Sequence, residues 1–439
     1  MAPVRSAIGH VRDPLYLNAY ALMASNLMTS ALGVVYWALA ARFYAVETVG
    51  VASATISLIA FLSGLSQLNL RAALLRLVPE AGAAAPRLVA TAYVVTIVVG
   101  GALGLIAFEA MSAFRLEPVA SLDVGGLSVL SVVLLTAATI VWNVFNIQDG
   151  LLTGLRRTIW VPLENAAYGI AKLVVLIGIA GTGTAAAILT SWYVPVVAVV
   201  AVVTAVVAWR WLPEHARAVL DRQHAATTLI GQRRRLLRYV ASDYIASLFA
   251  LATSTLLPVL IANSLGAAHQ DEVAYFYLAW IVAASLDLLP INLFASLTVE
   301  AASGRADLAT ETRRALLHSA RILVPVMLGI AVFAPLLLQV FGATYAARGT
   351  DLLRLLALGV IPYMVVTICL AAARVQGRSR DLVAIQAALA VLALGGSALL
   401  VGPYGITGVG VAMLGARTIM AIILGWTRLW PLLRGRAAR

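Results

Sequence analysis

The sequence contains little charge and almost no cysteine. Only 11% of its 439 residues are Asp, Glu, Lys or Arg, whereas 62% are hydrophobic, and the mean hydropathy is +0.96. A water-soluble chain of this length would need far more charge to cover its surface. The single cysteine, Cys369, lies in an apolar run, so no disulfide can form within one chain. We find no cleavable signal peptide, because the first apolar run, from about Leu17, is too long and lacks a cleavage-site pattern.

Motifs of several enzyme classes are missing as well. The five His residues and the one Cys show no metal-binding spacing, and no Gly-rich loop of the Walker type is present. We therefore expect no metal, no nucleotide and no other cofactor. The connections on one side of the predicted helices are short, such as 180–183 and 401–404, and leave no room for a catalytic domain. The longest polar segment, 211–238, is too short for a glycosyltransferase domain. The chain is therefore not expected to be an enzyme.

The net charge of +12 does not indicate a nucleic-acid-binding protein. The 31 basic residues are all Arg except Lys172, and they fall in short loops rather than on one long polar face. Nucleic acid is therefore not expected as a partner.

What the chain has instead is about twelve apolar stretches. At 1.5 Å per residue, a helix of about 20 residues crosses the roughly 30 Å hydrocarbon core of a bilayer. The pattern predicts an all-α polytopic membrane protein with about twelve transmembrane helices. The predicted spans are 17–41, 48–70, 88–111, 124–147, 162–180, 184–209, 239–265, 273–297, 316–341, 351–373, 382–400 and 405–427.

The distribution of Arg residues predicts the orientation. About 25 of the basic residues fall in the termini and in alternate loops, and about three fall on the opposite side. Under the positive-inside rule this places both termini in the cytoplasm and the protein in the cytoplasmic membrane. The basic segment 211–238 is then a cytoplasmic linker between an N-terminal lobe, 1–210, and a C-terminal lobe, 239–439.

The two predicted lobes resemble each other in sequence. The run Gly154-Leu-Arg-Arg corresponds to Gly377-Arg-Ser-Arg, both just before a fifth helix, and Gly181 corresponds to Gly405 before a sixth. Because each lobe has six spans, the two copies have the same orientation. This is a parallel repeat, an arrangement found in transporters that open alternately to the two sides of the membrane.

Four stretches carry a resemblance to a known family. They are Gly50-Val-Ala-Ser-Ala-Thr with Leu68-Asn-Leu-Arg-Ala-Ala-Leu-Leu-Arg-Leu-Val-Pro-Glu; Gly150-Leu-Leu-Thr-Gly-Leu-Arg-Arg; Ala274-Tyr-Phe-Tyr-Leu-Ala; and Phe341-Gly-Ala-Thr-Tyr with Leu352-Leu-Arg-Leu-Leu-Ala. In their order over nearly the whole chain, they resemble the multidrug/oligosaccharidyl-lipid/polysaccharide flippase superfamily, and within it the polysaccharide biosynthesis (O-antigen type) flippases. The resemblance implies movement of a polyprenyl-(pyro)phosphate-linked oligosaccharide. The chain lacks the two additional helices of the flippase for the peptidoglycan lipid precursor.

Two basic residues are expected near the middle of the bilayer, where a charge is costly and usually faces a cavity or a partner. Lys172 lies in the fifth predicted helix and Arg417 in the last. We predict that both bind the phosphates of the substrate, Arg417 through bidentate hydrogen bonds and Lys172 as a point charge. The alternative is that each forms an internal ion pair that only fixes helix packing.

Several other polar residues are candidates for the cavity or for ion coupling. Glu164, Tyr168 and Lys172 are spaced by four and share one face of a helix, although an acid at a helix start, as at Glu164, is also favoured by the helix dipole. Asp287 is a candidate for proton or sodium coupling, or for neutralising Arg417 or Lys172. Asp243 begins the seventh helix, where it either lies at a cavity mouth or is simply a helix-start acid.

Polar and small residues in the first and seventh predicted helices suggest a cavity lining and bending points. Asn26 in the first helix, like Ser247 and Ser254 in the seventh, is a candidate for binding sugar hydroxyls or for helix–helix packing. Gly33 and Pro258 are candidate hinges for alternating access, or static kinks.

These observations predict a flippase for lipid-linked oligosaccharides that serves cell-surface polysaccharide biosynthesis in the cell envelope. Its expected partners are membrane lipid, the lipid-linked oligosaccharide, a proton or sodium ion, and glycan-assembly enzymes. Three alternatives stay open: a multidrug exporter of the same superfamily, which would favour acidic cavity residues; a membrane-embedded glycan polymerase or ligase; and a scaffold in a cell-envelope assembly, with both cations sealed in ion pairs.

Overall fold

The computed structural model describes residues 14–113, 129–220, 233–302 and 308–434, and these residues form helices and short turns without any strand. Ten of the described helical segments are long and apolar enough to cross a membrane, and Met28–Phe43 is a shorter apolar segment. One of the ten, Ser379–Leu433, contains two predicted spans joined by a turn at Gly405, which brings the number to the predicted twelve. The chain is therefore an all-α polytopic membrane protein, as predicted.

The chain forms two compact units, and the division falls within the predicted linker 211–238 and also runs through a helix. Unit 1 comprises Met1–Phe43 and Leu62–Ile230, and unit 2 comprises Tyr44–Phe61 and Gly231–Arg439. The reason lies in α3 (Val46–Ser66). A Cβ atom at Gly50 would lie 1.8 Å from the carbonyl oxygen of Gln270, so the first half of this helix packs closely on unit 2. Gly50 allows that close approach.

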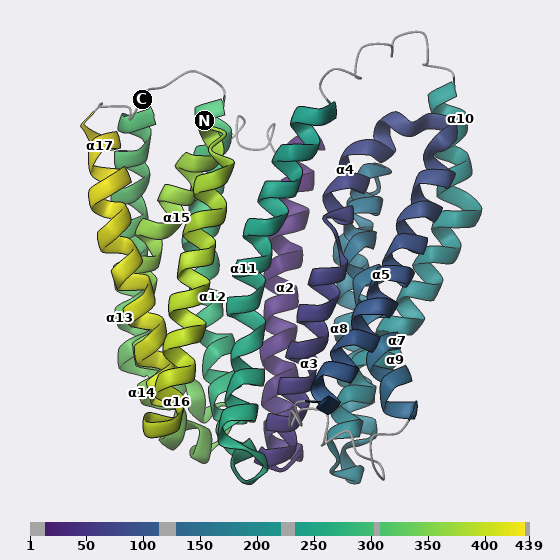
Figure 1. Ribbon diagram of the computed structural model, residues 1–439. Helices are drawn as coiled ribbons and strands as arrows, with labels where there is room; N and C mark the ends of the chain where they lie inside the picture. The colour runs from purple at the N-terminus through teal and green to yellow at the C-terminus, as the bar shows by residue number, and fades with distance from the viewer. Residues whose placement is uncertain (1–13, 114–128, 221–232, 303–307, 435–439) are drawn as a thin grey trace, which may run out of the picture. The chain divides into compact units, whose positions relative to one another are not determined.

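The long helices of unit 1 run side by side (Figure 1). In this unit α7 packs against α4 and α5, and α8 packs against α2 and α9. The helices are α2 (Pro14–Phe43), α4 (Leu70–Ala81), α5 (Ala85–Ala113), α7 (Val129–Gly154), α8 (Trp160–Gly178), α9 (Ala185–Val206) and α10 (Leu212–Leu220).

The short helix α4 was not predicted. Leu68 and Asn69 have left-handed backbone conformations, with φ of 46° and 59°, and they separate α3 from α4. Arg71 and Arg76 therefore lie in a separate helix and do not directly continue the predicted span 48–70. The helix was missed because its 12 residues are too few to span a bilayer.

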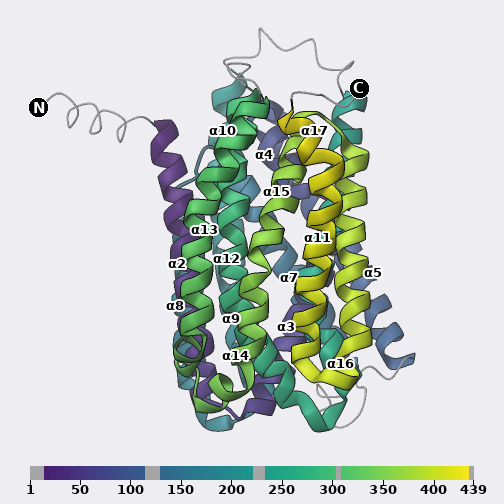
Figure 2. The same ribbon diagram turned by 90° about the vertical axis from the view of Figure 1, so that its left-hand side faces the viewer.

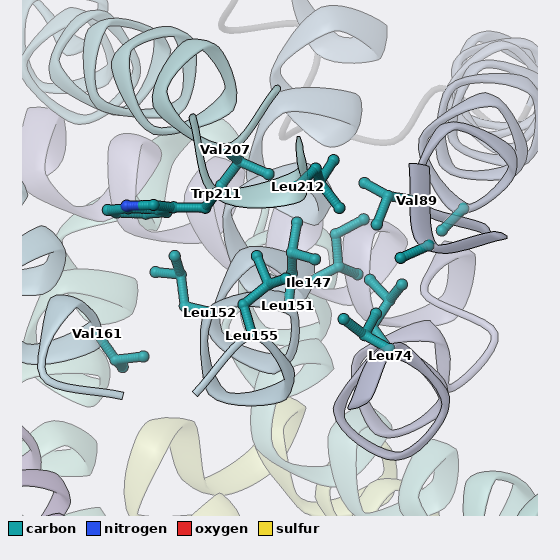
Figure 3. Close-up of a cluster of buried hydrophobic side chains, with 13 residues drawn as sticks. Leu74, Val89, Ile147, Leu151, Leu152, Leu155, Val161, Val207, Trp211 and Leu212 are labelled. Carbon is teal, nitrogen blue, oxygen red and sulfur yellow. The ribbon is translucent and has the colours of Figure 1, made fainter. Parts of the chain in front are cut away.

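The predicted linker 211–238 is also partly folded. Its first part, α10, packs on unit 1, where Trp211 and Leu212 are buried and the His215 ring donates a hydrogen bond to the Val78 carbonyl oxygen at 2.9 Å. Figure 3 shows the apolar cluster that Trp211 and Leu212 join, with side chains from α4, α5, α7 and α8. At the other end, α11 begins at Arg233, inside the predicted linker. Segment 221–232 is outside the described residues.

Unit 2 contains the remaining long helices. In this unit α16 packs against α11 and α15, and the neighbouring α15 and α16 can be followed in Figure 2. Gly405, with φ of 56° and ψ of −148°, makes a turn inside α16 and divides it into the predicted eleventh and twelfth helices. The helices are α11 (Arg233–Leu265), α12 (Gln270–Ala302), α13 (Leu308–Gln339), α14 (Ala343–Leu358), α15 (Val360–Val375), α16 (Ser379–Leu424) and α17 (Trp430–Leu433).

Equivalent turns in the two units define the repeat more closely than the sequence did. Arg156 and Gly377 both have left-handed conformations, with φ of 59° and 65°. The next residue in each case donates a backbone hydrogen bond to the carbonyl five residues earlier, at 2.8 and 2.9 Å, which is the Schellman motif. The residue that corresponds to Gly377 is therefore Arg156 and not Gly154. Likewise Gly183, with φ of 63°, and not Gly181, shares a positive φ with Gly405, although the ψ angles of the two differ, 9° against −148°.

A second shared feature is a π-helical turn at the end of each unit's last long helix. Val207–Trp211 follows α9 in unit 1, and Gly425–Leu429 follows α16 in unit 2. Each turn contains an Arg, at 210 and 428, and each Arg is followed three residues later by a Pro. Arg210 bonds Glu214, and Arg428 bonds Asp381.

Candidate substrate-binding site

The face of α8 that carries Lys172 points into unit 1. Glu164, Tyr168 and Lys172 are all buried, with 5–6% of each residue exposed, whereas Ile170 and Val174 on the other face are exposed by 56% and 64%. The apolar residues of α8 thus face outward and the polar residues face inward. This reversed pattern is expected for a helix that meets lipid on one side.

Lys172 lies among aromatic rings. Its Nζ atom is 4.8 Å from the ring centre of Tyr36, 5.1 Å from that of Tyr168 and 4.5 Å from that of Trp192. These distances are within the range of cation–π interactions. No carboxylate lies within ion-pair distance of Lys172 among the residues whose side chains are described. The predicted helix face is present, but Glu164 does not neutralise Lys172.

The rings around Lys172 are fixed by further contacts from three helices. The Tyr36 hydroxyl forms a 2.7 Å hydrogen bond with Ser191 on α9. Trp142 on α7 packs on Tyr168 and on Trp192, with ring centres 5.8 and 5.3 Å apart. The buried Nε1 donor of Trp192 has no hydrogen-bond partner in the described part of the chain. We call Tyr36, Trp142, Tyr168 and Trp192 the aromatic cage.

Arg417 in unit 2 has a different partner. Its guanidinium donates two hydrogen bonds to the Asp287 carboxylate, from Nη1 to Oδ1 at 3.0 Å and from Nη2 to Oδ2 at 2.5 Å. The Tyr363 ring lies 4.5 Å from the guanidinium carbon. Gly359 leaves room for this side chain, since a Cβ atom there would lie 3.3 Å from Arg417 Cδ. The ion pair considered for Asp287 and Arg417 is therefore formed.

The pair lies on the wall of a cavity of about 410 Å³ within unit 2. Asp287 and Arg417 provide its charged lining, and Trp280, Tyr363 and Gln386 provide aromatic and amide groups. Two of the hydroxyl residues singled out in the seventh predicted helix, Ser247 and Ser254 on α11, also line it. The wall thus combines a guanidinium–carboxylate pair, aromatic rings and hydroxyl groups.

The other predicted site residues lie elsewhere. Asp243 does not begin its helix, because α11 already starts at Arg233; it forms an ion pair with Arg374 at 3.4 Å, and both side chains are about 40% exposed. Gly33 and Pro258 lie inside α2 and α11, which continue through them. Asn26 is in α2, but its side chain is outside the described residues.

Two groups of residues were missed by the sequence analysis. The cage residues Tyr36 and Trp192 come from α2 and α9, and only the spacing of Tyr168 and Lys172 on one helix gave a signal. A second polar group contains Asp149 on α7, which interacts electrostatically with Glu164, and its chain neighbour Gln148. Asp149 was overlooked because the predicted fourth span ended at 147, although α7 continues to Gly154.

Comparison with solved structures identifies the fold. The lipid II flippase MurJ, in an inward closed conformation, has a TM-score of 0.68 at 12% identity, over 96% of this chain and 90% of that chain. An inward-facing multidrug resistance MATE family transporter of the MOP superfamily has a TM-score of 0.67 at 17% identity, over 94% and 96%. A MOP superfamily transporter from Pyrococcus furiosus, described as having a binding pocket of reverse polarity, has a TM-score of 0.50 at 15% identity, over 97% and 96%.

This chain has the fold of the MOP superfamily transporters. No family model matches the sequence, and no curated protein matches it. The superfamily resemblance proposed from the sequence therefore agrees with the fold.

Proposed function

We propose that this chain is a flippase that moves a polyprenyl-(pyro)phosphate-linked oligosaccharide across the cytoplasmic membrane by alternating access. The observation that carries the proposal is Lys172. It is a buried ammonium near the middle of a transmembrane helix, held by aromatic rings and without a carboxylate partner among the described side chains. A charge in such a place is costly unless it serves a ligand. A phosphate would supply the missing negative charge.

The second cation, Arg417, supports the same proposal. Asp287 occupies the bidentate position on Arg417 that a phosphate would take, because carboxylate and phosphate oxygens match the guanidinium in the same geometry. The cavity beside the pair, about 410 Å³, is of the size of small-ligand sites, roughly 300–1,000 Å³. In the proposed mechanism the phosphate displaces Asp287 from Arg417.

The remaining lining of the cavity fits a saccharide. The Trp280 ring offers a flat apolar face for a sugar ring, and Ser247 and Ser254 offer hydroxyl groups for hydrogen bonds. The lipid II flippase among the structures of the same fold is named for a lipid substrate. On this basis the protein serves polysaccharide biosynthesis in the cell envelope, with membrane lipid, the lipid-linked oligosaccharide and glycan-assembly enzymes as its partners and with both termini in the cytoplasm.

Asp287 is also the proposed coupling residue. Once a phosphate has taken its place on Arg417, the freed carboxylate needs a proton or a sodium ion to balance its charge. If transport continues unchanged after both the proton and the sodium gradients are collapsed, Asp287 has no coupling role.

Gly33 and Pro258 are the proposed hinges.

A multidrug exporter is the second candidate, because multidrug transporters share the fold and because Asp287 lies on the cavity wall. A cationic drug would need that carboxylate to be free. Arg417 neutralises it, so the wall carries no net negative charge from this pair. A scaffold would need both cations to be sealed, whereas Arg417 borders a cavity and Lys172 has no carboxylate partner in the described part.

The test is flipping of a fluorescent polyprenyl-pyrophosphate-linked oligosaccharide in vesicles that contain the purified protein. Lys172→Ala and Arg417→Ala, alone and together, should lower the flipping rate at least tenfold. Arg354→Ala is the matched control, since this arginine lies in α14, is 47% exposed and bonds Asp351 away from the cavity. Unchanged flipping in the double variant would refute the assignment. Export of a cationic dye by the wild type would favour the second candidate.

A further inference from the structure

A buried acidic group lies in unit 1, away from both cations. Glu164 is 5% exposed, and neither of its two carboxylate oxygens has a hydrogen-bond partner among the described residues. Asp149, on the adjacent α7, is close enough to interact with it electrostatically. Two carboxylates therefore share one interior region of the unit.

Among the described residues, the cation that contacts Asp149 is already engaged, and none forms an ion pair with Glu164. Arg71 on α4 forms an ion pair with Asp149 at 3.2 Å. Lys172 lies two turns further along α8, inside the aromatic cage. Among the described residues of the packed helices, α9 presents no charged group, and the described part of α2 presents Tyr36 and Arg42. One negative charge at Glu164 would thus be left without compensation.

Polar groups beside the acids point in the same direction. The Gln148 side-chain amide donates to the Thr204 hydroxyl at 3.0 Å and to the Tyr93 hydroxyl at 3.4 Å. Its own oxygen is buried and has no donor in the described part of the chain. Tyr93 is in electrostatic contact with Glu164. Gln148 is the chain neighbour of Asp149 and bonds Tyr93, so polar groups surround the two acids although none of them bonds Glu164 in the described part of the chain.

The surroundings make an ionised Glu164 costly. Val161, one turn before it, and Leu152, one turn after Asp149, belong to the apolar cluster of Figure 3. A carboxylate in such surroundings, without hydrogen bonds, loses its hydration and takes up a proton instead.

We infer that Glu164 and Asp149 form a proton-binding site in unit 1, in which Glu164 carries the proton and Asp149 stays ionised on Arg71. Binding adds one proton to one carboxylate oxygen of Glu164 and removes one negative charge from the interior. The site releases the proton when water reaches it. This inference does not depend on the proposed substrate.

Infrared spectroscopy of the full-length protein in lipid nanodiscs tests the site. At neutral pH the wild type should show the C=O stretch of a protonated carboxylic acid, and Glu164→Gln should lose it. Glu80→Gln, which changes an exposed acid on α4, should keep it. Glu164→Asp should shift the band without removing it, and this variant decides the assignment if Glu164→Gln is not monodisperse.

Three results would overturn the inference. They are a wild type without the band, a band that persists in Glu164→Gln, and a band that disappears when sodium chloride is added at constant pH, which would make the site a cation site. Asp149→Asn leaves Arg71 free to pair with Glu164, so the band should weaken at neutral pH. An unchanged band in that variant would remove Asp149 from the site.

Discussion

Arg417 and Asp287 join α16 to α12 through two parallel hydrogen bonds at the wall of a cavity. Only 6% of the Arg417 side chain and 16% of the Asp287 side chain are exposed. The pair is therefore both a structural contact and the place where an anion can compete. The first prediction separates these two roles.

Removal of one member of this pair should destabilise the protein more than removal of both. A buried charge left without its partner costs about 3–5 kcal/mol, whereas an apolar replacement of both partners is nearly neutral. Thermal unfolding in detergent of Arg417→Met, Asp287→Leu and the double variant measures this. Additive effects of the two substitutions would mean that the pair contributes no coupling energy.

The aromatic cage should stabilise Lys172 as a cation. Trp192→Leu removes the nearest ring, and a cation–π contact is worth about 0.5–2 kcal/mol. The substitution should therefore cost more stability in the wild type than in Lys172→Met, and unfolding of the four proteins gives the difference. Tyr193→Leu is the control, because Tyr193 packs on Trp142 at 6.4 Å, outside the set of rings around Lys172. Equal costs of Trp192→Leu in both backgrounds would show that the ring does not act on the charge.

Substitution by alanine should have opposite effects on stability at two glycines, Gly150 and Gly33. A Cβ atom at Gly150 would lie 2.2 Å from the carbonyl oxygen of Arg71, so Gly150→Ala should separate α4 from α7 and cost about 1–3 kcal/mol or more. At Gly33, an added Cβ atom would have no described atom within 4 Å apart from the neighbouring backbone of its own helix. Alanine stabilises a helix by up to about 1 kcal/mol relative to glycine.

Gly33→Ala should therefore fold at least as well as the wild type, and this makes it a clean test of the hinge. If α2 bends at Gly33 during transport, the variant flips substrate more slowly although it is stable. A stable variant with wild-type transport would exclude a hinge at this residue. Reduced thermal stability of Gly33→Ala would contradict the steric argument itself.

The turn inside α16 should depend on Gly405. Its φ of 56° with ψ of −148° is a conformation that only glycine adopts easily, so Gly405→Ala should cost about 1–3 kcal/mol. Gly402→Ala is the matched control, because both glycines have open space around them but Gly402 has no positive φ. Melting temperatures of the two variants give the comparison, and equal values would contradict the prediction.

The transmembrane helices could be predicted because long apolar runs have few alternatives in a bilayer. The helices α4 and α10 could not, since they are short and carry charges, and their burial depends on Trp211 and Leu212 meeting partners from other helices. Their positions depend on packing between helices, which the length of an apolar run does not predict.

For the candidate site, helical spacing found one face of one helix and nothing beyond it. Glu164, Tyr168 and Lys172 do share a buried face, but Tyr36 and Trp192 come from distant parts of the sequence. The Arg417–Asp287 pair joins residues 130 positions apart, and it was only one of several options open for Asp287. Which acid meets which base is decided by how α12 and α16 pack.

The π-helical turns at Val207–Trp211 and Gly425–Leu429 bear on the history of the chain. Such turns are rare in proteins, and here one stands at the same place in each unit, with an arginine and a proline at the same spacing. Independent origin of two such irregularities is a poor explanation. A shared irregularity of this kind is what duplication of a single six-helix unit would leave in the present chain.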